Sequence, residues 1–343
     1  MESNRKTTTG RLGLAAGAAA ALAVGLVAAG PAGAIGATGA TSRTSASVSG
    51  DTLGVRGSSA SESLALRLAP GDANTLQVDF GDDGTAEHSF DRSTFTSIEV
   101  SLRSGNDRFR VDQVNGAFAD ESLTVDGGSG NDTLDGGDGV ELFYGASGRD
   151  AVDGNRGNDT GVLGSGQDSF RWDPGDGSDI VEGESGFDTL DFNGAGVNEQ
   201  MSLSANGGRS LFLRDIATIR MDMDGVERLD LDALGGADAM TVGDMRGTDI
   251  RQADIDLSGP TGGGDAATDT VTVTGTERAD RIDVGASGQV VEVDGLRAAV
   301  DVAGGEIADR LQVNALGGND DVDVDQAALA IMTVAVDLGL GQR

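Results

Sequence analysis

The chain has 343 residues, and its 57 acidic residues against 24 Lys and Arg give a formal net charge of −33 at pH 7. This charge argues against nucleic acid or an anionic membrane surface as a partner and favours a cation. The chain contains no cysteine, so no disulfide can hold the fold together, and with 3% aromatic residues large side chains cannot supply a heavy hydrophobic core. Metal ions and hydrogen-bonded strand ladders remain as the expected sources of stability.

Residues 1–34 have the pattern of a secretory signal peptide. Three basic residues precede an apolar run over residues 12–29, and Ala32-Gly33-Ala34 offers a small-residue cleavage site. We therefore expect export by the general secretory route and an extracellular mature protein. An uncleaved apolar run is the one feature that would hold this chain at a membrane.

Residues 35–50 are rich in Ser, Thr, Ala and Gly, a composition typical of a disordered leader. An N-terminal β segment is expected over residues 45–126, where apolar and polar residues alternate at a period of two, as in half-buried strands. Residues 51–57 of this segment align without a gap on residues 269–275, an offset of 218. The alignment indicates an internal duplication.

The most regular part of the chain is residues 127–194, where a nine-residue pattern occurs seven times. The units run GGSGNDTLD, GGDGVELFY, GASGRDAVD, GNRGNDTGV, LGSGQDSFR, PGDGSDIVE and GESGFDTLD, with Trp172-Asp173 inserted before the sixth. Glycine recurs at positions one, two and four, an acid at position six and usually a bulky apolar residue at position eight. This matches G-G-x-G-x-D-x-U-x, the pattern of calcium-binding parallel β-helices.

With these repeats the sequence resembles the RTX family, also called hemolysin-type calcium-binding repeat proteins, a group that includes secreted bacterial proteins. Residues 223–236, 272–276 and 314–320 of the flanking segments resemble the same group. The resemblance implies a parallel β-helix, or β-roll, with calcium ions bound between stacked turns. It also implies that glycine turns supply backbone carbonyl ligands, here at Gly127, Gly128, Gly130, Gly145, Gly148, Gly164 and Gly166.

In a β-helix of this kind six residues of each unit form a turn and three form a strand, so units two apart lie on the same edge, about 4.8 Å apart. The first predicted column of acids contains Asp132, Asp150, Asp168 and Asp188. The second contains Glu141, Asp159 and Asp179. Like charges at this spacing repel by roughly 0.9 kcal/mol per pair even with the screening of bulk water. Calcium, a hard cation that prefers oxygen ligands, is expected between neighbouring members of each column.

The second column is expected to be the weaker one. Glu141 is one methylene longer than aspartate, and Gly161 leaves an inward position unfilled. In the first column, the insertion Trp172-Asp173 must either bulge out or shift one coil. Inside the coils we expect a narrow apolar ladder formed by Leu134, Phe143, Val152, Phe170, Val181 and Leu190.

Residues 195–343 are expected to continue as β-solenoid or β-sandwich-like segments, with helix nearly absent. Isolated Gly-x-Asp turns end at Asp107, Asp238 and Asp320, and we interpret them as β-turns with a favourable aspartate rather than as ion sites. The glycine-rich residues 259–264 predict a flexible connector. Residues 338–343 lie in the middle of an expected strand and turn, which indicates a truncated or open end.

The sequence offers no catalytic constellation. His88 is the only histidine, which rules out a zinc site of two or three histidines, and no serine has glycine at both minus two and plus two. We expect a nonenzymatic, secreted calcium-binding β-solenoid whose repeats fold or become rigid with calcium, at a Kd of about 10⁻⁴ to 10⁻³ M per site. Two alternatives stay open. One is a calcium-stiffened surface adhesion or matrix protein that binds cell-surface or extracellular glycans, and the less favoured one is a carbohydrate-active β-helix enzyme.

Overall fold

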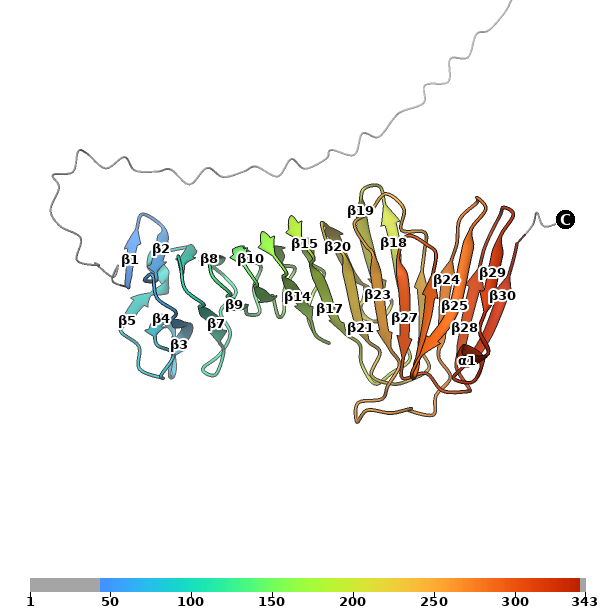
Figure 1. Ribbon diagram of the computed structural model, residues 1–343. Coiled ribbons are helices and arrows are strands. Elements are labelled where there is room, and N and C mark those ends of the chain that lie inside the picture. The colour runs from blue at the N-terminus through green and yellow to red at the C-terminus, as the bar shows by residue number, and fades with distance from the viewer. Residues whose placement is uncertain (1–43, 340–343) are drawn as a thin grey trace, which may run out of the picture. The chain divides into compact units, whose positions relative to one another are not determined.

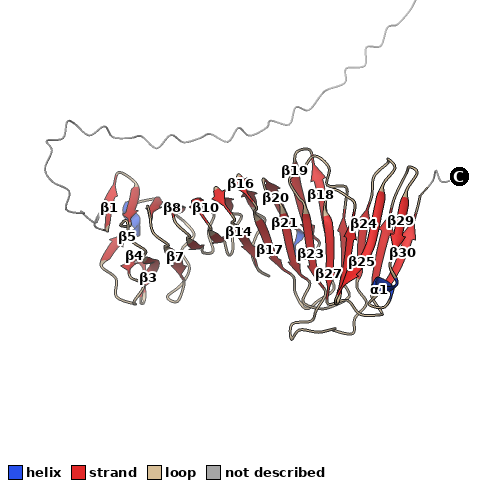
Figure 2. Ribbon diagram, in the orientation of Figure 1, coloured by secondary structure: helices blue, strands red, loops and turns tan. Residues whose placement is uncertain are grey.

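The computed structural model describes residues 44–339, and these residues are almost entirely β-structure in two long sheets (Figure 1). Within this part of the chain, helix is limited to α1 (Gln326–Leu329) and two 3-10 turns, η1 (Arg92–Thr94) and η2 (Ile216–Thr218) (Figure 2). The expected all-β fold and the near absence of helix are confirmed. No helix of the described residues is long and apolar enough to cross a membrane. The expected signal peptide lies outside the described residues.

The first sheet has 16 strands. In spatial order its main path is β1 (Ser45–Ser49), β2 (Thr52–Arg56), β6 (Ser97–Ser101), β8 (Ser122–Ser129), β10 (Glu141–Gly148), β12 (Thr160–Val162), β15 (Ile180–Glu182), β20 (Ile219–Asp224), β19 (Arg209–Arg214), β18 (Gln200–Asn206), β22 (Ala239–Val242), β24 (Thr270–Thr274), β28 (Arg310–Asn314) and β30 (Thr333–Asp337). Two short strands lie off this path, β13 (Ser165–Gly166) beside β10 and β16 (Ser185–Gly186) beside β13.

The second sheet has 14 strands. In spatial order they are β29 (Asp321–Val324), β25 (Arg281–Ser287), β26 (Val290–Asp294), β27 (Ala299–Ala303), β23 (Gln252–Asp256), β21 (Arg228–Asp232), β17 (Thr189–Asn193), β14 (Ser169–Trp172), β11 (Ala151–Asp153), β9 (Thr133–Asp135), β7 (Arg108–Asp112), β3 (Ser63–Ala69), β4 (Asp72–Phe80) and β5 (His88–Asp91).

In the repeat block the chain alternates between the two sheets, and each strand pairs in parallel with the strand of the next coil. In the second sheet Thr133 pairs with Ala151, and Ala151 pairs with Ser169. In the first sheet Leu142 pairs with Thr160. The pairing therefore advances by 18 residues, twice the nine-residue period, and by 20 residues across the inserted pair.

Alternate side chains of both sheets point inward and form one continuous apolar core. The predicted ladder is confirmed, because all six of its side chains, Leu134, Phe143, Val152, Phe170, Val181 and Leu190, are at most 1% exposed. The expectation of an empty inward position at Gly161 is wrong. A Cβ built on Gly161 would lie 2.7 Å from Cδ2 of Phe170, so the phenylalanine ring already fills that space.

The inserted pair neither bulges out nor shifts a coil. Trp172 is fully buried at the end of β14, in register with Phe192 of β17. The two rings stack with centroids 4.1 Å apart, and the Trp172 Nε1–H donates to the Gly177 carbonyl at 2.8 Å. The longer coil is thus filled by an aromatic pair, and the coils widen at this point because β14 and β17 are longer than β9 and β11.

The flanking segments contain three copies of one unit: a strand, a turn, a three-stranded antiparallel meander, a strand, a second turn and a strand. The copies are β2–β7, β17–β22 and β24–β29. Strand β23 lies between the second and the third copy. The first and third copies add their meander to the 14-stranded sheet, and the second adds its meander to the 16-stranded sheet. The second copy is therefore displaced by half a coil.

Both sheets run through all three expected β segments, and residues 44–339 belong to one compact unit. Ser45–Ser49 forms β1, antiparallel to β2, so the expected disordered leader does not extend to residue 50. The glycine-rich residues 259–264 lie in the loop between β23 and β24.

The contact at Gly161 gives a test of the core. Gly161→Ala should lower the free energy of unfolding by about 1–3 kcal/mol, because the new methyl group overlaps the buried Phe170 ring. Gly196→Ala is the control, since nothing lies within 4 Å of its Cβ position, and it should change stability by less than about 0.5 kcal/mol. Urea unfolding in metal-free buffer measures both, and equal effects of the two substitutions would contradict this packing.

Candidate metal centre

The four aspartates of the first predicted column lie in successive coils where the chain passes from the 16-stranded to the 14-stranded sheet. The backbone N–H of Asp132 donates to Oδ1 of Asp150 at 2.7 Å, that of Asp150 to Asp168 at 2.8 Å, and that of Asp168 to Asp188 at 2.9 Å. All four residues are at most 2% exposed. The structure therefore brings this column together, across the inserted pair as well.

The second predicted column is assembled in the same way on the opposite edge. The backbone N–H of Glu141 donates to Oδ1 of Asp159 at 2.8 Å, and that of Asp159 donates to Oδ1 of Asp179 at 2.8 Å. In both columns one carboxylate oxygen thus replaces the strand hydrogen bond that each turn interrupts.

The ladders of acids extend beyond the nonapeptides, an extension that the sequence analysis did not predict. In the first column the backbone N–H of Glu62 donates to Asp107, that of Asp107 to Asp132, and that of Asp188 to Glu227. A separate ladder in the C-terminal segment runs through Glu199, Asp238, Asp269 and Asp309. The sequence feature that could have predicted these acids is an acidic residue directly before a strand of alternating apolar and polar residues, whether or not glycines precede it.

Asparagine at position five of a turn forms a second ladder in the opposite direction. Oδ1 of Asn106 accepts the N–H of Asn131, and Oδ1 of Asn131 accepts the N–H of Arg149, both at 2.9 Å. Asn158 accepts the N–H of Ser178 in the same way at 2.8 Å. The recurring Asn-Asp pair therefore holds each coil to the next one through asparagine and to the preceding one through aspartate.

The position-four glycines are required because successive turns touch through their backbones. A Cβ on Gly148 would lie 1.8 Å from the carbonyl oxygen of Gly130, and a Cβ on Gly166 would lie 1.5 Å from that of Gly148. Gly130 and Gly148 also have φ of 123° and 143°, which disfavour any side chain. The first-position glycines are crowded by the acids themselves, since a Cβ on Gly127 or Gly145 would lie within 2.8 Å of Oδ2 of Asp132 or Asp150.

The second carboxylate oxygen divides the turns into two kinds. In what we term open turns, Oδ2 is buried and has no hydrogen-bond partner within residues 44–339. Seven turns of this kind end at Asp107, Asp132, Asp150, Asp159, Asp168, Asp188 and Asp238. In each, the residue at position two of the turn has a left-handed φ, between 56° and 102°, at Arg103, Gly128, Ala146, Asn155, Gly164, Glu184 and Leu234.

In what we term closed turns, the second oxygen accepts the N–H of position two of its own turn. Glu62 accepts from Ser58 at 2.6 Å, Glu141 from Gly137 at 3.2 Å, and Glu199 from Ala195 at 2.7 Å. Asp280 accepts from Thr276 at 2.6 Å. The position-two residues of these turns have no positive φ. Glu141 therefore satisfies its own carboxylate, because the extra methylene lets it fold back over its turn.

The acids of the columns are held in an environment that favours their neutral form. Burial, and to a smaller degree the like charges of the same column, raise the pKa of Asp150 and of Asp188 to about 7. Burial also raises the pKa of Asp132 and of Asp168. The adjacent side chains of Glu141 and Asp159 have raised pKa values for the same reason. A cation between coils would reverse this effect by favouring the charged carboxylates.

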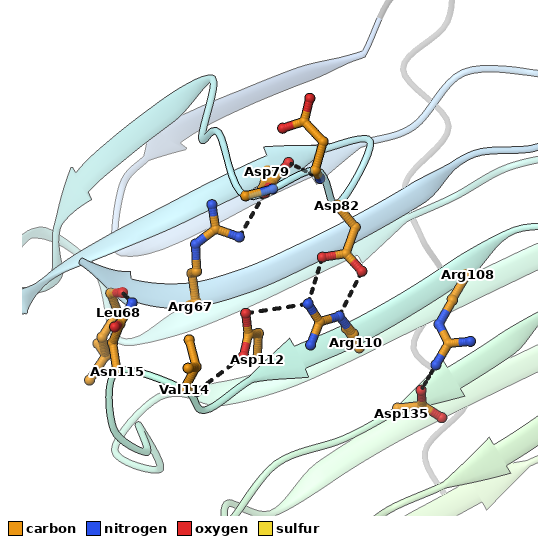
Figure 3. Close-up of polar contacts among 12 residues, drawn as sticks. Arg67, Leu68, Asp79, Asp82, Arg108, Arg110, Asp112, Val114, Asn115 and Asp135 are labelled. Atoms are coloured by element: carbon orange, nitrogen blue, oxygen red, sulfur yellow. Dashed lines mark hydrogen bonds and ion pairs between the residues drawn. The ribbon is translucent and has the colours of Figure 1, made fainter. Parts of the chain in front are cut away.

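Elsewhere in the chain, arginine pairs with acidic side chains. In the N-terminal segment Arg67 contacts the buried Asp79 at 2.6 Å, and Arg110 contacts Asp82 at 2.6 Å (Figure 3). The hydrogen bond from Arg110 lowers the pKa of Asp82. Among residues 44–339 no ion pair reaches any of the seven open-turn aspartates. Their carboxylates therefore have no basic counter-ion among the described residues.

The donor set of an open turn fits a hard cation. It consists of a buried carboxylate oxygen and the carbonyl groups of a glycine-rich turn, with neither sulfur nor imidazole. Within the described part of the chain no three His, Cys, Asp or Glu side chains come together as a metal-binding group. Backbone carbonyl oxygens must therefore supply a large share of the ligands for any ion held here.

Comparison with protein-family models found no match, and comparison with curated proteins found none either.

The raised pKa values predict how stability depends on pH without metal. Asp150 has an ordinary pKa of 3.8 and a folded-state pKa of about 7, so between these values the folded state binds more protons than the unfolded state. In the presence of a chelator, stability should therefore fall as the pH rises from about 4 to about 8, an interval that spans the two pKa values. Thermal unfolding followed by circular dichroism measures this, and a midpoint that rises over the same range would refute the buried, unpaired state of these carboxylates.

Proposed function

We propose that this protein is a secreted, RTX-type calcium-binding β-solenoid whose open turns bind calcium ions between neighbouring coils. The observation that carries the proposal is the row of buried Oδ2 atoms without a partner at Asp132, Asp150, Asp168 and Asp188. The 18-residue advance of the pairing, twice the nonapeptide period, supports a β-roll in this block. Carbonyl ligands would come from the glycine turns, including Gly127, Gly128 and Gly130.

Electrostatics explains why such a row needs an ion. Two carboxylates one coil apart repel by roughly 0.9 kcal/mol at the dielectric constant of water and by about 3.5 kcal/mol at an effective value of 20. The cost accumulates along the column, because interior members such as Asp150 have a neighbour on each side. A divalent cation turns each repulsive pair into two attractive ones, so the turns become rigid when it binds.

The ligand chemistry favours calcium over magnesium. Calcium accepts six to eight oxygen ligands in flexible geometry, carbonyl groups included, whereas magnesium demands a regular octahedron and keeps its water molecules. A site built from backbone turns cannot adjust to a strict octahedron, because the coils contact each other directly at Gly130 and Gly148. The expected Kd of about 10⁻⁴ to 10⁻³ M fits extracellular calcium and the secretion that residues 1–34 predict.

We assign the columns no catalytic role. One oxygen of every predicted acid already accepts a backbone N–H, from the preceding coil as at Asp150 and Asp168, or from its own turn as at Glu141. A carboxylate pair held this way serves coil stacking and cation binding rather than acid–base chemistry.

Asp150 offers the sharpest test, because it belongs to two neighbouring pairs of the first column. Asp150→Asn keeps an oxygen for the Asp132 N–H and removes an unpaired buried charge, so the metal-free protein should become more stable. The stabilisation by calcium should fall by about 2–3 kcal/mol for each lost site at a calcium concentration of about 100 times Kd. Urea unfolding with calcium or with a chelator measures both quantities.

Asp280→Asn is the matched control, since Asp280 ends a closed turn whose carboxylate accepts the Thr276 N–H. It should destabilise the metal-free protein and leave the calcium-dependent gain unchanged. An undiminished calcium gain in the Asp150 variant, or an equal gain with magnesium in the wild-type protein, would sink the proposal.

A further inference from the structure

A turn outside the nonapeptide block has the backbone of an open turn. Residues 233–238, with the sequence ALGGAD, lack glycine at positions one and two. Nevertheless positions two and four have a positive φ, as in the nonapeptide turns. Position two has φ of 63° at Leu234 and 93° at Gly128, and position four has φ of 122° at Gly236 and 123° at Gly130. A leucine in the left-handed region is costly, so the surrounding coils must impose this conformation.

The acid of this turn is buried and only half satisfied. Asp238 is 4% exposed, and its Oδ1 accepts the N–H of Glu199 at 2.8 Å. Its Oδ2 is buried without a hydrogen-bond partner in the described part of the chain. The sequence alone favoured an ordinary β-turn at this position, but a β-turn does not require a buried carboxylate oxygen with no donor.

Two further acids approach from the next coil. The N–H of Asp238 donates to Oδ1 of Asp269 at 2.8 Å, and the N–H of Gly236 donates to Oδ2 of Asp265 at 2.7 Å. Asp265 belongs to the loop between β23 and β24, which also contains the glycine-rich residues 259–264. Within residues 44–339 none of these three acids has an ion pair with a basic side chain.

The neighbouring coil shows how the fold neutralises an acid by itself. Glu199 forms a buried ion pair with Arg214, and its second oxygen accepts the N–H of Ala195. Asp309, at the other end of this ladder, closes its own turn by accepting the N–H of Glu306 at 2.6 Å. Asp238 lies between these two satisfied acids in the ladder and has neither arrangement.

We propose that the turn at Asp238 is an additional binding site for a divalent cation with oxygen ligands, and that calcium is its ion. The inference rests on the proposed function for its chemistry, but it concerns a separate part of the chain. Asp238 Oδ2 would be the principal side-chain ligand, with turn carbonyl groups completing the set. The ion would also fasten the β23–β24 loop to the turn, because Asp265 already bridges them.

Hydrogen–deuterium exchange of the full chain, with calcium, with magnesium and with a chelator, tests the site directly. Calcium should slow exchange of the amides in residues 233–242 as well as in residues 145–168. Protection of residues 145–168 without protection of residues 233–242 would overturn this inference and leave the proposed function standing. Protection of neither region would overturn both.

Two matched variants locate the ion. Asp238→Asn should abolish calcium protection of residues 233–242, leave that of residues 145–168 intact and lower the calcium stoichiometry by about one ion, since one site is removed. Asp309→Asn should leave protection of both regions unchanged, because the Asp309 carboxylate already accepts the backbone N–H of Glu306. If Asp238→Asn does not fold, the wild-type exchange pattern still decides. Undiminished protection of residues 233–242 in a folded Asp238→Asn protein would refute the site.

Discussion

The structure depends on one hydrogen bond, repeated at the edge of nearly every coil. A carboxylate oxygen at the end of each turn accepts the backbone N–H of the equivalent acid in the preceding coil, as between Asp150 and Asp132. This bond continues the parallel ladder through the turn, where the backbone alone cannot. Its consequence is a row of buried carboxylates, and the second oxygen of each must find a donor, a proton or a cation.

The chain resolves that need in three ways. In closed turns a backbone N–H of the same turn donates to the carboxylate, as Gly137 does to Glu141. At Glu199 an arginine supplies a fixed positive charge. The open turns do neither, and they share a left-handed residue at position two. We infer that the conformation of one residue separates turns made for stacking from turns made for a cation, and that glycine at position two makes the second kind inexpensive.

The equivalence of the two edges also explains the flanking segments. One unit, a strand, turn and antiparallel meander, occurs three times, and its middle copy adds the meander to the opposite sheet. The same turn can close either edge because both edges pass the chain between parallel sheets over one shared core. Duplication by half a coil therefore preserves the acid ladders while it moves the meander to the other face.

The sequence by itself determined the period, the apolar ladder and the membership of both acid columns, because glycine, aspartate and apolar residues recur at fixed positions of a nine-residue unit. It could not show that Phe170 fills the space above Gly161 or that Trp172 packs inside on Phe192, since these depend on the width of each coil. Nor could it separate Glu141 from Asp238. The local sequence pattern favoured Glu141 and disfavoured Asp238 as an ion site. Only the tertiary structure decided which carboxylate has a donor, because φ at Leu234 is imposed by the neighbouring coils and Glu141 meets the Gly137 N–H only once its turn is folded.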